Sequence, residues 1–220
     1  MKSIVLLSGG LDSAVSLTHA MKETEVALCL TFDYGQLAAK NEIMAATALA
    51  KYYKVRHRII LLPFLKEITD NAITSEQALH TPNKCGTSGS SAASSLWVPN
   101  RNGLFINIAA AFAEAYRCNL VITGFNREEA VVFPDNSPEF VRAANSALSH
   151  STLNKVKVIS YTQRLNKEEI VRLGIKNGLP FYYLWSCYRG GKNMCGRCDS
   201  CLRFTRAAKS AGLELSRVKQ

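Results

Sequence analysis

The chain has 220 residues, of which 47% are hydrophobic and 20% charged, and its formal net charge is +10. This composition excludes a disordered chain and suits one globular domain with a small appendage. No apolar run approaches the roughly 20 residues that cross a bilayer, and the apolar N-terminus runs into Gly9-Gly10 without a cleavage site. We therefore expect a cytoplasmic protein with no membrane partner.

Strand-like apolar runs alternate with helical patterns along the chain. We predict strands at residues 3–8, 26–32, 57–62, 120–123 and 156–159. We predict helices at residues 13–22, 37–53, 63–68, 103–117, 137–148 and 166–177. Asn166 is the expected N-cap of the last helix and Gly178 its expected C-cap. Residues 83–95 are rich in Gly and Ser and predict a mobile loop.

This alternation predicts an α/β fold with a doubly wound, parallel, five-stranded, Rossmann-like sheet. Ligands of such sheets bind beyond the carboxyl ends of the strands, so the informative residues are those that follow each strand. We divide the chain into a nucleotide-binding domain, residues 1–180, and a metal-binding module with a C-terminal helix packed on it, residues 181–220.

The first predicted strand is followed by the turn Ser8-Gly9-Gly10-Leu11-Asp12-Ser13, which opens the first helix. Two glycines allow close approach of a ligand, and the free N–H groups and dipole of the helix start favour an anion. An aspartate in an anion site is explained if Mg²⁺ bridges it to phosphates. The Walker and Rossmann glycine patterns are both absent. The alternative is a plain Gly-rich turn that Asp12 caps.

The second motif consists of four cysteines near the C-terminus with the spacing Cys-x7-Cys-x2-Cys-x2-Cys, namely Cys187, Cys195, Cys198 and Cys201. Four thiolates form a closed tetrahedral shell around a structural Zn²⁺. An iron–sulfur cluster, which also uses four thiolates, and a redox dithiol remain alternatives. Cys29 and Cys118 are expected to be buried core residues, and Cys85 has no assignment.

The turn resembles the Ser-Gly-Gly-x-Asp-Ser signature of the N-type ATP pyrophosphatases, a class of ATP-dependent enzymes. Together with the four cysteines, the chain resembles the 7-cyano-7-deazaguanine synthases of queuosine biosynthesis nearly end to end. Five further segments carry the resemblance: residues 31–36 (Thr-Phe-Asp-Tyr-Gly-Gln), 98–102 (Val-Pro-Asn-Arg-Asn), 123–124 (Thr-Gly), 133–140 (Phe-Pro-Asp…Glu-Phe) and 185–188 (Trp-Ser-Cys-Tyr). The chain departs from the family pattern at Leu11, at Asn100, at residues 126–129 and at residues 136–137.

The resemblance implies a ligase that joins 7-carboxy-7-deazaguanine and ammonia at the expense of ATP, with Mg²⁺ and Zn²⁺ as cofactors, and a homodimer. It implies ATP-binding residues in and around the turn and after two strands: Leu7, Ser8, Gly9, Gly10, Leu11, Asp12, Ser13, Asp33 and Gly124. The implied catalytic residues are Asp12, Ser13, Arg101 and Asp135. Asp33 alternatively caps the next helix, and Asp135 alternatively is a plain turn residue.

Several other features receive no catalytic role. Glu128 and Glu129 are expected to be solvated in a loop. The aromatic residues Tyr182, Tyr183 and Trp185 are expected to belong to the core or an interface, with stacking on a base as the alternative. The residues from 189 to 220 include eight basic and two acidic ones, which a solvated surface with phosphate-binding groups explains. A nucleic-acid partner is the less favoured explanation.

Three alternatives to this ligase stay open. One is a tRNA-modifying thiolase of the same class, which the basic tail favours. The others are a related enzyme that acts on another substrate and a zinc-binding adaptor without turnover. An intact phosphate-binding turn argues against the adaptor, and the lack of evident catalytic cysteines near the turn argues against the thiolase.

Overall fold

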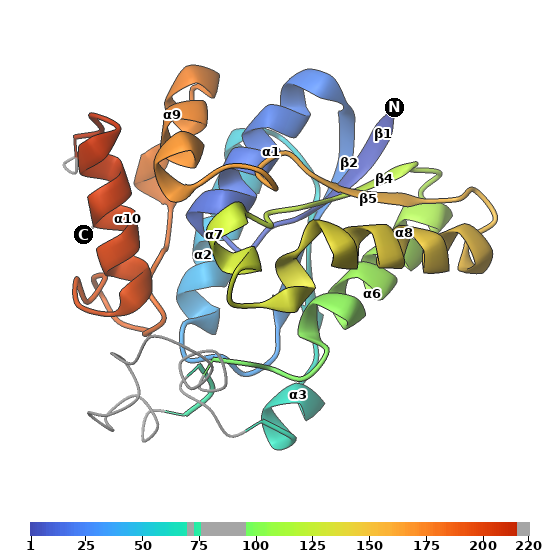
Figure 1. Cartoon of the computed structure of the whole chain (residues 1–220), viewed down its shortest axis with the longest axis horizontal. Coiled ribbons are helices and arrows are strands. Elements are labelled where there is room, and N and C mark those ends of the chain that lie inside the picture. The colour runs from blue at the N-terminus through green and yellow to red at the C-terminus, as the bar shows by residue number, and fades with distance from the viewer. Residues whose placement is uncertain (70–72, 76–95, 215–220) are drawn as a thin grey trace.

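The computed structural model describes residues 1–69, 73–75 and 96–214, which form one α/β unit (Figure 1). The loop expected at residues 83–95, with Cys85 in it, lies outside the described residues.

Five parallel strands form a single sheet in the order β3-β2-β1-β4-β5. The strands are β1 (Lys2–Leu6), β2 (Glu25–Asp33), β3 (His57–Leu61), β4 (Leu120–Thr123) and β5 (Lys157–Ser160). The chain builds the sheet outward from β1 to β3 on one side and then from β4 to β5 on the other. The strand order therefore reverses between β1 and β4, and open α/β sheets bind ligands at such a point.

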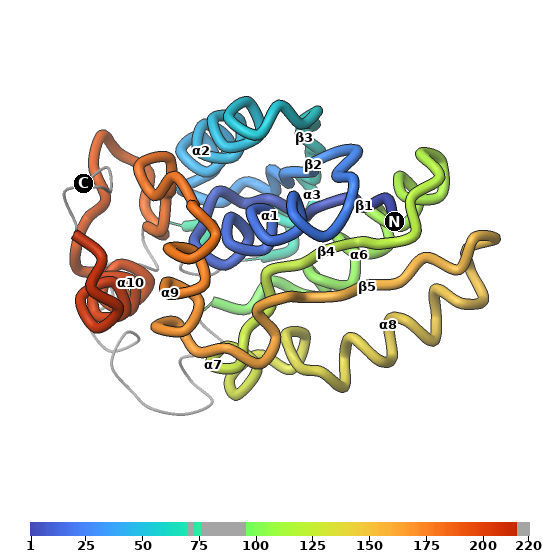
Figure 2. The backbone as a smooth tube through the Cα atoms, turned by 90° about the horizontal axis from the view of Figure 1, so that it is seen from above, coloured from blue at the N-terminus to red at the C-terminus, as the bar shows by residue number. Residues whose placement is uncertain are grey.

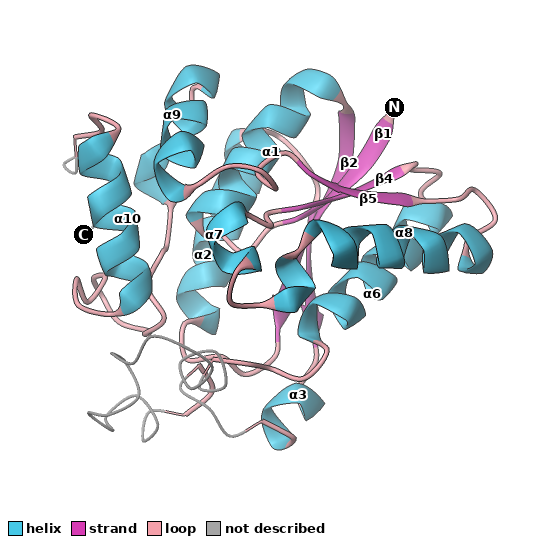
Figure 3. Cartoon of the chain, in the orientation of Figure 1, coloured by secondary structure: helices cyan, strands magenta, loops and turns pink. Residues whose placement is uncertain are grey.

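Helices cover both faces of this sheet (Figure 3). They are α1 (Leu11–Glu23), α2 (Ala39–Tyr52), α3 (Phe64–Glu67), α6 (Arg101–Ala115), α7 (Arg127–Ala130), α8 (Pro138–Ser151), α9 (Lys167–Asn177) and α10 (Asp199–Ser210), with 3-10 turns η1 (Pro134–Asn136) and η2 (Phe181–Tyr183). Every predicted strand and helix is present, with ends shifted by a few residues. α7, η1 and η2 were not predicted, because each is only one short turn.

The core has two layers, one on each face of the sheet. Neighbouring residues of β1 serve opposite layers, as the period of two in a strand requires: Val5 packs under α1, α2 and α9, and Ile4 packs against α6 and α8. Both residues are fully buried. The sheet is therefore apolar on both faces, and its polar groups lie at the strand ends.

The ends of α9 show how local sequence sets an element. Asn166 accepts a hydrogen bond from the Glu169 backbone, and the Glu169 side chain accepts one from the Asn166 N–H, which is a complete capping box. Gly178 ends the helix with a left-handed φ of 77°. Both caps were predicted. They fix the two ends of α9, whose first residue is Lys167.

The C-terminal segment packs against the main sheet domain. α10 lies beside α9 at one end of the molecule (Figure 2), and Phe204 and Ala208 of α10 belong to the same core layer as Val5. The backbone N–H of Trp185 donates to the carbonyl of Gly9 at 2.9 Å. Among the described residues, no helix is long and apolar enough to cross a membrane.

Candidate active site and metal centre

A cavity of about 280 Å³ opens at the carboxyl ends of the strands, beside the point where the strand order reverses. Its lining includes most of the residues that the sequence predicted for the site: Leu7, Ser8, Gly10, Leu11, Asp12, Ser13, Arg101 and Gly124. Aromatic side chains, among them Tyr34, Phe105 and Trp185, form much of the remaining wall. The cavity thus combines a phosphate-type turn with flat apolar surfaces.

The turn after β1 is held by its two serines. The hydroxyls of Ser8 and Ser13 lie 3.0 Å apart, and the backbone N–H groups of Ser8 and Gly10 donate to Ser13 Oγ and Ser8 Oγ at 3.2 and 3.3 Å. Gly10 is the N-cap of α1 and has no side-chain cap. The first N–H groups of α1 are therefore left for another acceptor, such as a phosphate.

Two glycines permit the close packing of this turn. A Cβ at Gly9, whose φ is +80°, would lie 2.6 Å from the Cβ of Ala45 in α2. A Cβ at Gly124, just after β4, would lie 2.7 Å from the backbone nitrogen of Ser13. The sequence predicted that Gly124 lets the chain pass close to the nucleotide. Gly124 lines the cavity, and its close neighbour within the protein is the backbone of the turn.

Asp12 belongs to a cluster of buried charges. Its Oδ2 lies 2.5 Å from Lys167 Nζ, which also contacts Glu129 Oε1 at 2.9 Å, and the Asn126 amide donates to the same Oδ2. The side chains of Lys167 and Asp12 are only 14% and 17% exposed. Burial raises the pKa of Asp12 despite Lys167, whereas in Glu129 the attraction of Lys167 outweighs burial and lowers the pKa. Two carboxylates thus share one ammonium group.

The expectation that Glu129 is solvated in a loop is wrong. Glu129 lies in α7, its side chain is 28% exposed, and it lines the cavity. Lys167 was missed as a site residue, because it stands seven residues beyond the end of β5, and no local pattern links it to Asp12. The only available signal was that Lys167 directly follows the capping residue Asn166. It is thus the first residue of a helix that starts at the ligand edge of the sheet.

Arg101, the first residue of α6, faces the cavity from the other side. Its guanidinium donates to the Tyr34 hydroxyl at 3.1 Å and lies over the Tyr34 ring. Burial alone would lower the pKa of Arg101, but Tyr34 and Asp135 hold it above its ordinary value. α6 starts at Asn100, whose φ of 51° is left-handed. Asn is, after Gly, among the residues that best tolerate this conformation.

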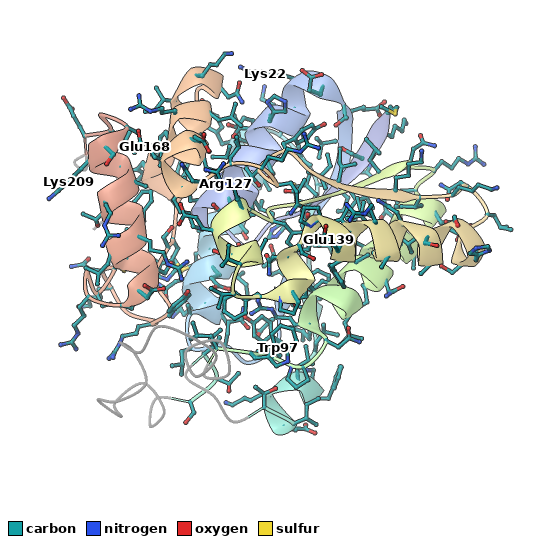
Figure 4. All side chains as sticks on the ribbon, in the orientation of Figure 1. Lys22, Trp97, Arg127, Glu139, Glu168 and Lys209 are labelled. Atoms are coloured by element: carbon teal, nitrogen blue, oxygen red, sulfur yellow. The ribbon has the colours of Figure 1, made fainter. Side chains whose placement is uncertain are left out.

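Three predicted residues are not among those that line the cavity: Gly9, which packs against α2, Asp33 and Asp135. Asp33 ends β2, and its Oδ1 accepts the Gly35 N–H at 3.0 Å, so it stabilises the turn after the strand. Asp135 lies in η1 and accepts a hydrogen bond from Asn136. Burial raises the pKa of Asp135 against the attraction of Arg101. Beside η1, Phe133 stacks on Trp97, which Figure 4 labels.

A carboxylate without a predicted role, that of Glu42 in α2, also lines the cavity. Gln36 donates to Glu42 Oε2 at 2.8 Å and to the Phe32 carbonyl, while its own oxygen accepts the Tyr34 N–H. Burial raises the pKa of Glu42, and the hydrogen bond from Gln36 opposes this. The sequence pattern of α2 is dominated by alanine and gave no signal for a functional carboxylate.

The four cysteines meet beyond the cavity, at the start of α10. All four sulfur atoms lie within 4.8 Å of one another. Cys187 Sγ accepts the N–H groups of Arg189 and Cys195, and Cys195 Sγ accepts that of Cys198. Such N–H···S bonds stabilise thiolates. The predicted ligand set is thus brought together in one place. Trp185, expected in a core or an interface, is buried beside it, and its indole donates to the Cys187 carbonyl.

The residues present fit the two implied metals. Four clustered sulfurs with backbone donors form the closed shell that structural Zn²⁺ prefers. Asp12 Oδ1 is buried and has no hydrogen-bond partner, although Oδ2 has two. A free carboxylate oxygen beside a phosphate-binding turn suits Mg²⁺, which is held by one or two carboxylates together with substrate phosphates.

The fold is shared with solved structures of low sequence identity. A predicted subunit of tRNA methyltransferase from Methanocaldococcus jannaschii aligns with a TM-score of 0.51 and 16% identity over 100% of this chain and 92% of its own. A 4-thiouridine synthetase in complex with RNA and bound ATP aligns with a TM-score of 0.50 and 19% identity over 96% of this chain and 50% of its own. At these identities the likeness establishes the fold alone.

Sequence comparison is more specific. The 7-cyano-7-deazaguanine synthase of Pelotomaculum thermopropionicum is 66% identical over 98% of this chain and 100% of its own length. That of Desulforudis audaxviator is 55% identical over 96% and 98%, and that of Methanosarcina barkeri 41% identical over 97% and 96%. The family model of the queuosine biosynthesis protein QueC matches residues 2–212. The chain therefore belongs to the QueC family.

Proposed function

We propose that this protein is an ATP-dependent ligase that converts 7-carboxy-7-deazaguanine and ammonia into 7-cyano-7-deazaguanine. The observation that carries the proposal is the phosphate-binding turn in the wall of a cavity with aromatic surfaces, in a chain that matches the QueC family over residues 2–212. Relatives at 41–66% identity bear the name of this activity.

The chemistry requires two activations. A carboxylate is a poor electrophile, so one of its oxygens attacks the α-phosphorus of ATP, and pyrophosphate leaves. Ammonia then attacks the acyl carbon, AMP leaves and an amide forms. A second ATP activates the amide oxygen in the same way, and the resulting imidate releases one N–H proton to water. Loss of the last N–H proton and of AMP then gives the nitrile. Each stage needs a site that holds the pyrophosphate group and neutralises its charge.

The turn of residues 8–13 binds the phosphates through the free N–H groups of α1 and the two serine hydroxyls. Asp12 holds Mg²⁺ through its unpartnered Oδ1, and the ion supplies charge neutralisation at the phosphates. Lys167 is a natural second phosphate ligand, since it already lines the cavity between Asp12 and Glu129. Gly124 keeps the turn in place, and Asp33 stabilises the segment after β2 next to the nucleotide.

Arg101 binds the carboxylate of the substrate before adenylation. A buried guanidinium is always charged, and the Tyr34 hydroxyl orients it. Asp135 in η1 interacts electrostatically with Arg101, and we assign it to the substrate side of the site. Zn²⁺ at the four cysteines is structural, because four thiolates leave no open position for chemistry.

The deciding experiment is incubation of the purified protein with ATP, Mg²⁺, an ammonium salt and 7-carboxy-7-deazaguanine, followed by mass spectrometry. We expect the amide and then the nitrile, both absent with Asp12→Asn. ATP consumption without either product overturns the substrate, and sulfur transfer to tRNA would indicate a thiolase instead. Among the described cavity residues the only cysteine is Cys187, which belongs to the metal cluster, and this disfavours a thiolase.

The family resemblance further implies a homodimer in the cytoplasm. Light scattering of the purified chain gives the mass directly, and a mass of one 24.2 kDa chain would contradict the dimer.

A further inference from the structure

Both stages of the proposed reaction, amide formation and nitrile formation, remove protons from nitrogen. Each stage therefore needs a base. At neutral pH the ammonia pool is mostly ammonium, which has no lone pair for attack. Nitrile formation in turn requires removal of the last N–H proton of the activated amide. A base that serves both stages has to reach the reacting carbon, and it has to be ionised in the resting enzyme.

Glu42 is the cavity carboxylate whose partners leave it free for this work. Asp12 and Glu129 are both bound to Lys167. Burial raises the pKa of Glu42, and both the hydrogen bond that Oε2 accepts from Gln36 and the charge of Arg101 oppose this by favouring the ionised form. Glu42 lines the cavity, and among the described residues the hydrogen bond to its carboxylate is made to Oε2, which leaves Oε1 for a ligand.

The position of Glu42 is fixed by a saturated amide. The Gln36 NH₂ group donates to Glu42 and to the Phe32 carbonyl, and the Gln36 oxygen accepts the Tyr34 N–H. Gln36 is 4% exposed. Because every hydrogen-bonding group of this amide is engaged, it cannot turn, and the carboxylate that it holds keeps one orientation.

Glu42 also lies next to the phosphate-binding turn, near the place where the acyl-adenylate forms. Its backbone packs so closely on the turn that a Cβ at Gly9 would lie 2.9 Å from the Glu42 carbonyl oxygen. Arg101, which we assign to the substrate carboxylate, lines the same cavity and acts electrostatically on the Glu42 carboxylate. The acyl-adenylate has to form between the turn and Arg101, so its carbon lies within the region that Glu42 borders.

We propose, on the basis of the ligase function above, that Glu42 is the general base for both proton removals. Ammonium gives a proton to Glu42 Oε1, the nitrogen lone pair forms the C–N bond, the C–O bond to AMP breaks, and a second proton leaves to water. The carboxyl group then returns its proton to water. In the second stage, adenylation of the amide oxygen releases one N–H proton to water. Oε1 then takes the last N–H proton, the electrons of that N–H bond complete the nitrile, and the second C–O bond to AMP breaks.

A rival role is recognition of the guanine-like edge of the substrate. That edge presents two parallel N–H donors, which a carboxylate reads with both oxygens. Gln36 already occupies one oxygen of Glu42. A carboxylate with a single free oxygen suits the removal of one proton at a time.

The test separates adenylation from the ammonia-dependent steps in Glu42→Gln. Exchange of pyrophosphate into ATP, driven by 7-carboxy-7-deazaguanine without ammonia, should stay within a few-fold of wild type, which also shows that the variant is folded. Amide formation from ammonium, and nitrile formation from the isolated amide, should each fall at least about a hundredfold. Hydroxylamine is largely unprotonated at neutral pH, so its hydroxamate should still form. Glu25→Gln, in a surface ion pair with Lys2, is the matched control.

Nitrile formation by Glu42→Gln at nearly the wild-type rate overturns the assignment. So does a raised KM for the deazapurine in the exchange assay, since that identifies Glu42 as the reader of the guanine edge. Loss of exchange together with loss of product places Glu42 in adenylation and also overturns it. A wild-type protein that shows neither exchange nor product overturns the ligase function itself, and the base assignment with it.

Discussion

The charged residues Asp12, Glu129 and Lys167 stabilise one another inside the site. Lys167 is shared by Asp12 and Glu129, so the resting cluster holds two carboxylates against one ammonium group. A buried charge that loses its partner is costly, because little water is available to replace it. The cluster is consequently ready to accept a cation beside Asp12 and is sensitive to the loss of Lys167.

Lys167→Met should lower the free energy of unfolding by about 3 kcal/mol at neutral pH. Without Lys167 the pKa values of both carboxylates rise in the folded state, so the folded variant binds more protons than wild type. The stability gap should therefore be small in acid and grow as the pH rises through those pKa values. Urea titrations of wild type and variant at several pH values measure this difference in the free energy of unfolding.

The double variant Lys167→Met, Asp12→Asn provides the control. It should recover part of the lost stability but no activity, because the proposed Mg²⁺ ligand and the proposed phosphate-binding lysine are both gone. Lys22→Met, which removes a surface lysine bonded to Asn177 and labelled in Figure 4, should change neither quantity. A stability gap that is the same at all pH values would contradict the charge argument.

Gly124→Ala should damage ATP binding without touching the nucleotide. The new Cβ would lie 2.7 Å from the Ser13 nitrogen, so the turn has to shift. We expect a cost of about 1–3 kcal/mol in stability and, because displaced catalytic groups lose rate steeply, at least about a tenfold loss in kcat/KM for ATP. Gly178→Ala is the matched control: its Cβ meets nothing within 4 Å, but φ is +77°. It should cost about 1 kcal/mol and leave the ATP kinetics unchanged.

At the scale of elements, the metal module is the part whose order depends on a bound ion. Residues 184–198 contain no helix or strand and carry three of the four cysteines, whose sulfurs meet that of Cys201 in the first turn of α10. A segment of this kind has little core of its own, so metal binding supplies much of its folding free energy. Trp185 and residues of α10 line the cavity, so disorder in the metal module would also disturb the cavity wall.

We expect one Zn²⁺ per chain by elemental analysis. Removal of the metal with a chelator should lower Tm and abolish ATP turnover, since the Trp185 contact with Gly9 is loosened. Cys198→Ser should do the same, while Cys118→Ser, at a buried thiol far from the cluster in sequence, should keep its metal. Iron with visible absorbance in place of zinc would establish the cluster alternative.

At the scale of the whole molecule, the predicted boundary at residue 180 does not separate two cores. Phe204, Ala207 and Ala208 of α10 share one apolar layer with Val5 and Ile122 of the central strands. The sheet domain would expose this surface if the module were removed. Two regions that are distinct in sequence thus form one packing unit.

A chain that ends at residue 180 should therefore fail to fold cooperatively and should not bind ATP. A chain that ends at residue 214 retains every described element and should behave as the full chain does. Thermal unfolding followed by circular dichroism, with and without ATP, distinguishes them. Cooperative unfolding of the shorter chain would show that residues 1–180 are an independent domain.

The sequence by itself determined the order and type of the main elements, the phosphate turn and the four ligands of the metal site. These features are local: they depend on periodicity, on glycines at fixed positions and on cysteine spacing within 15 residues. The capping of α9 by Asn166 and Gly178 was readable for the same reason.

Tertiary structure alone decided which distant residues share the cavity. Lys167 reaches Asp12 across 155 positions, and Glu129 and Glu42 face the ligand edge only because α7 and α2 pack there. Tertiary structure also packs Gly124 against the backbone of the phosphate-binding turn and places Asp33 outside the cavity lining. Such contacts follow from strand order and helix packing, and a parallel sheet sets these through long-range crossovers that leave no local mark in the sequence.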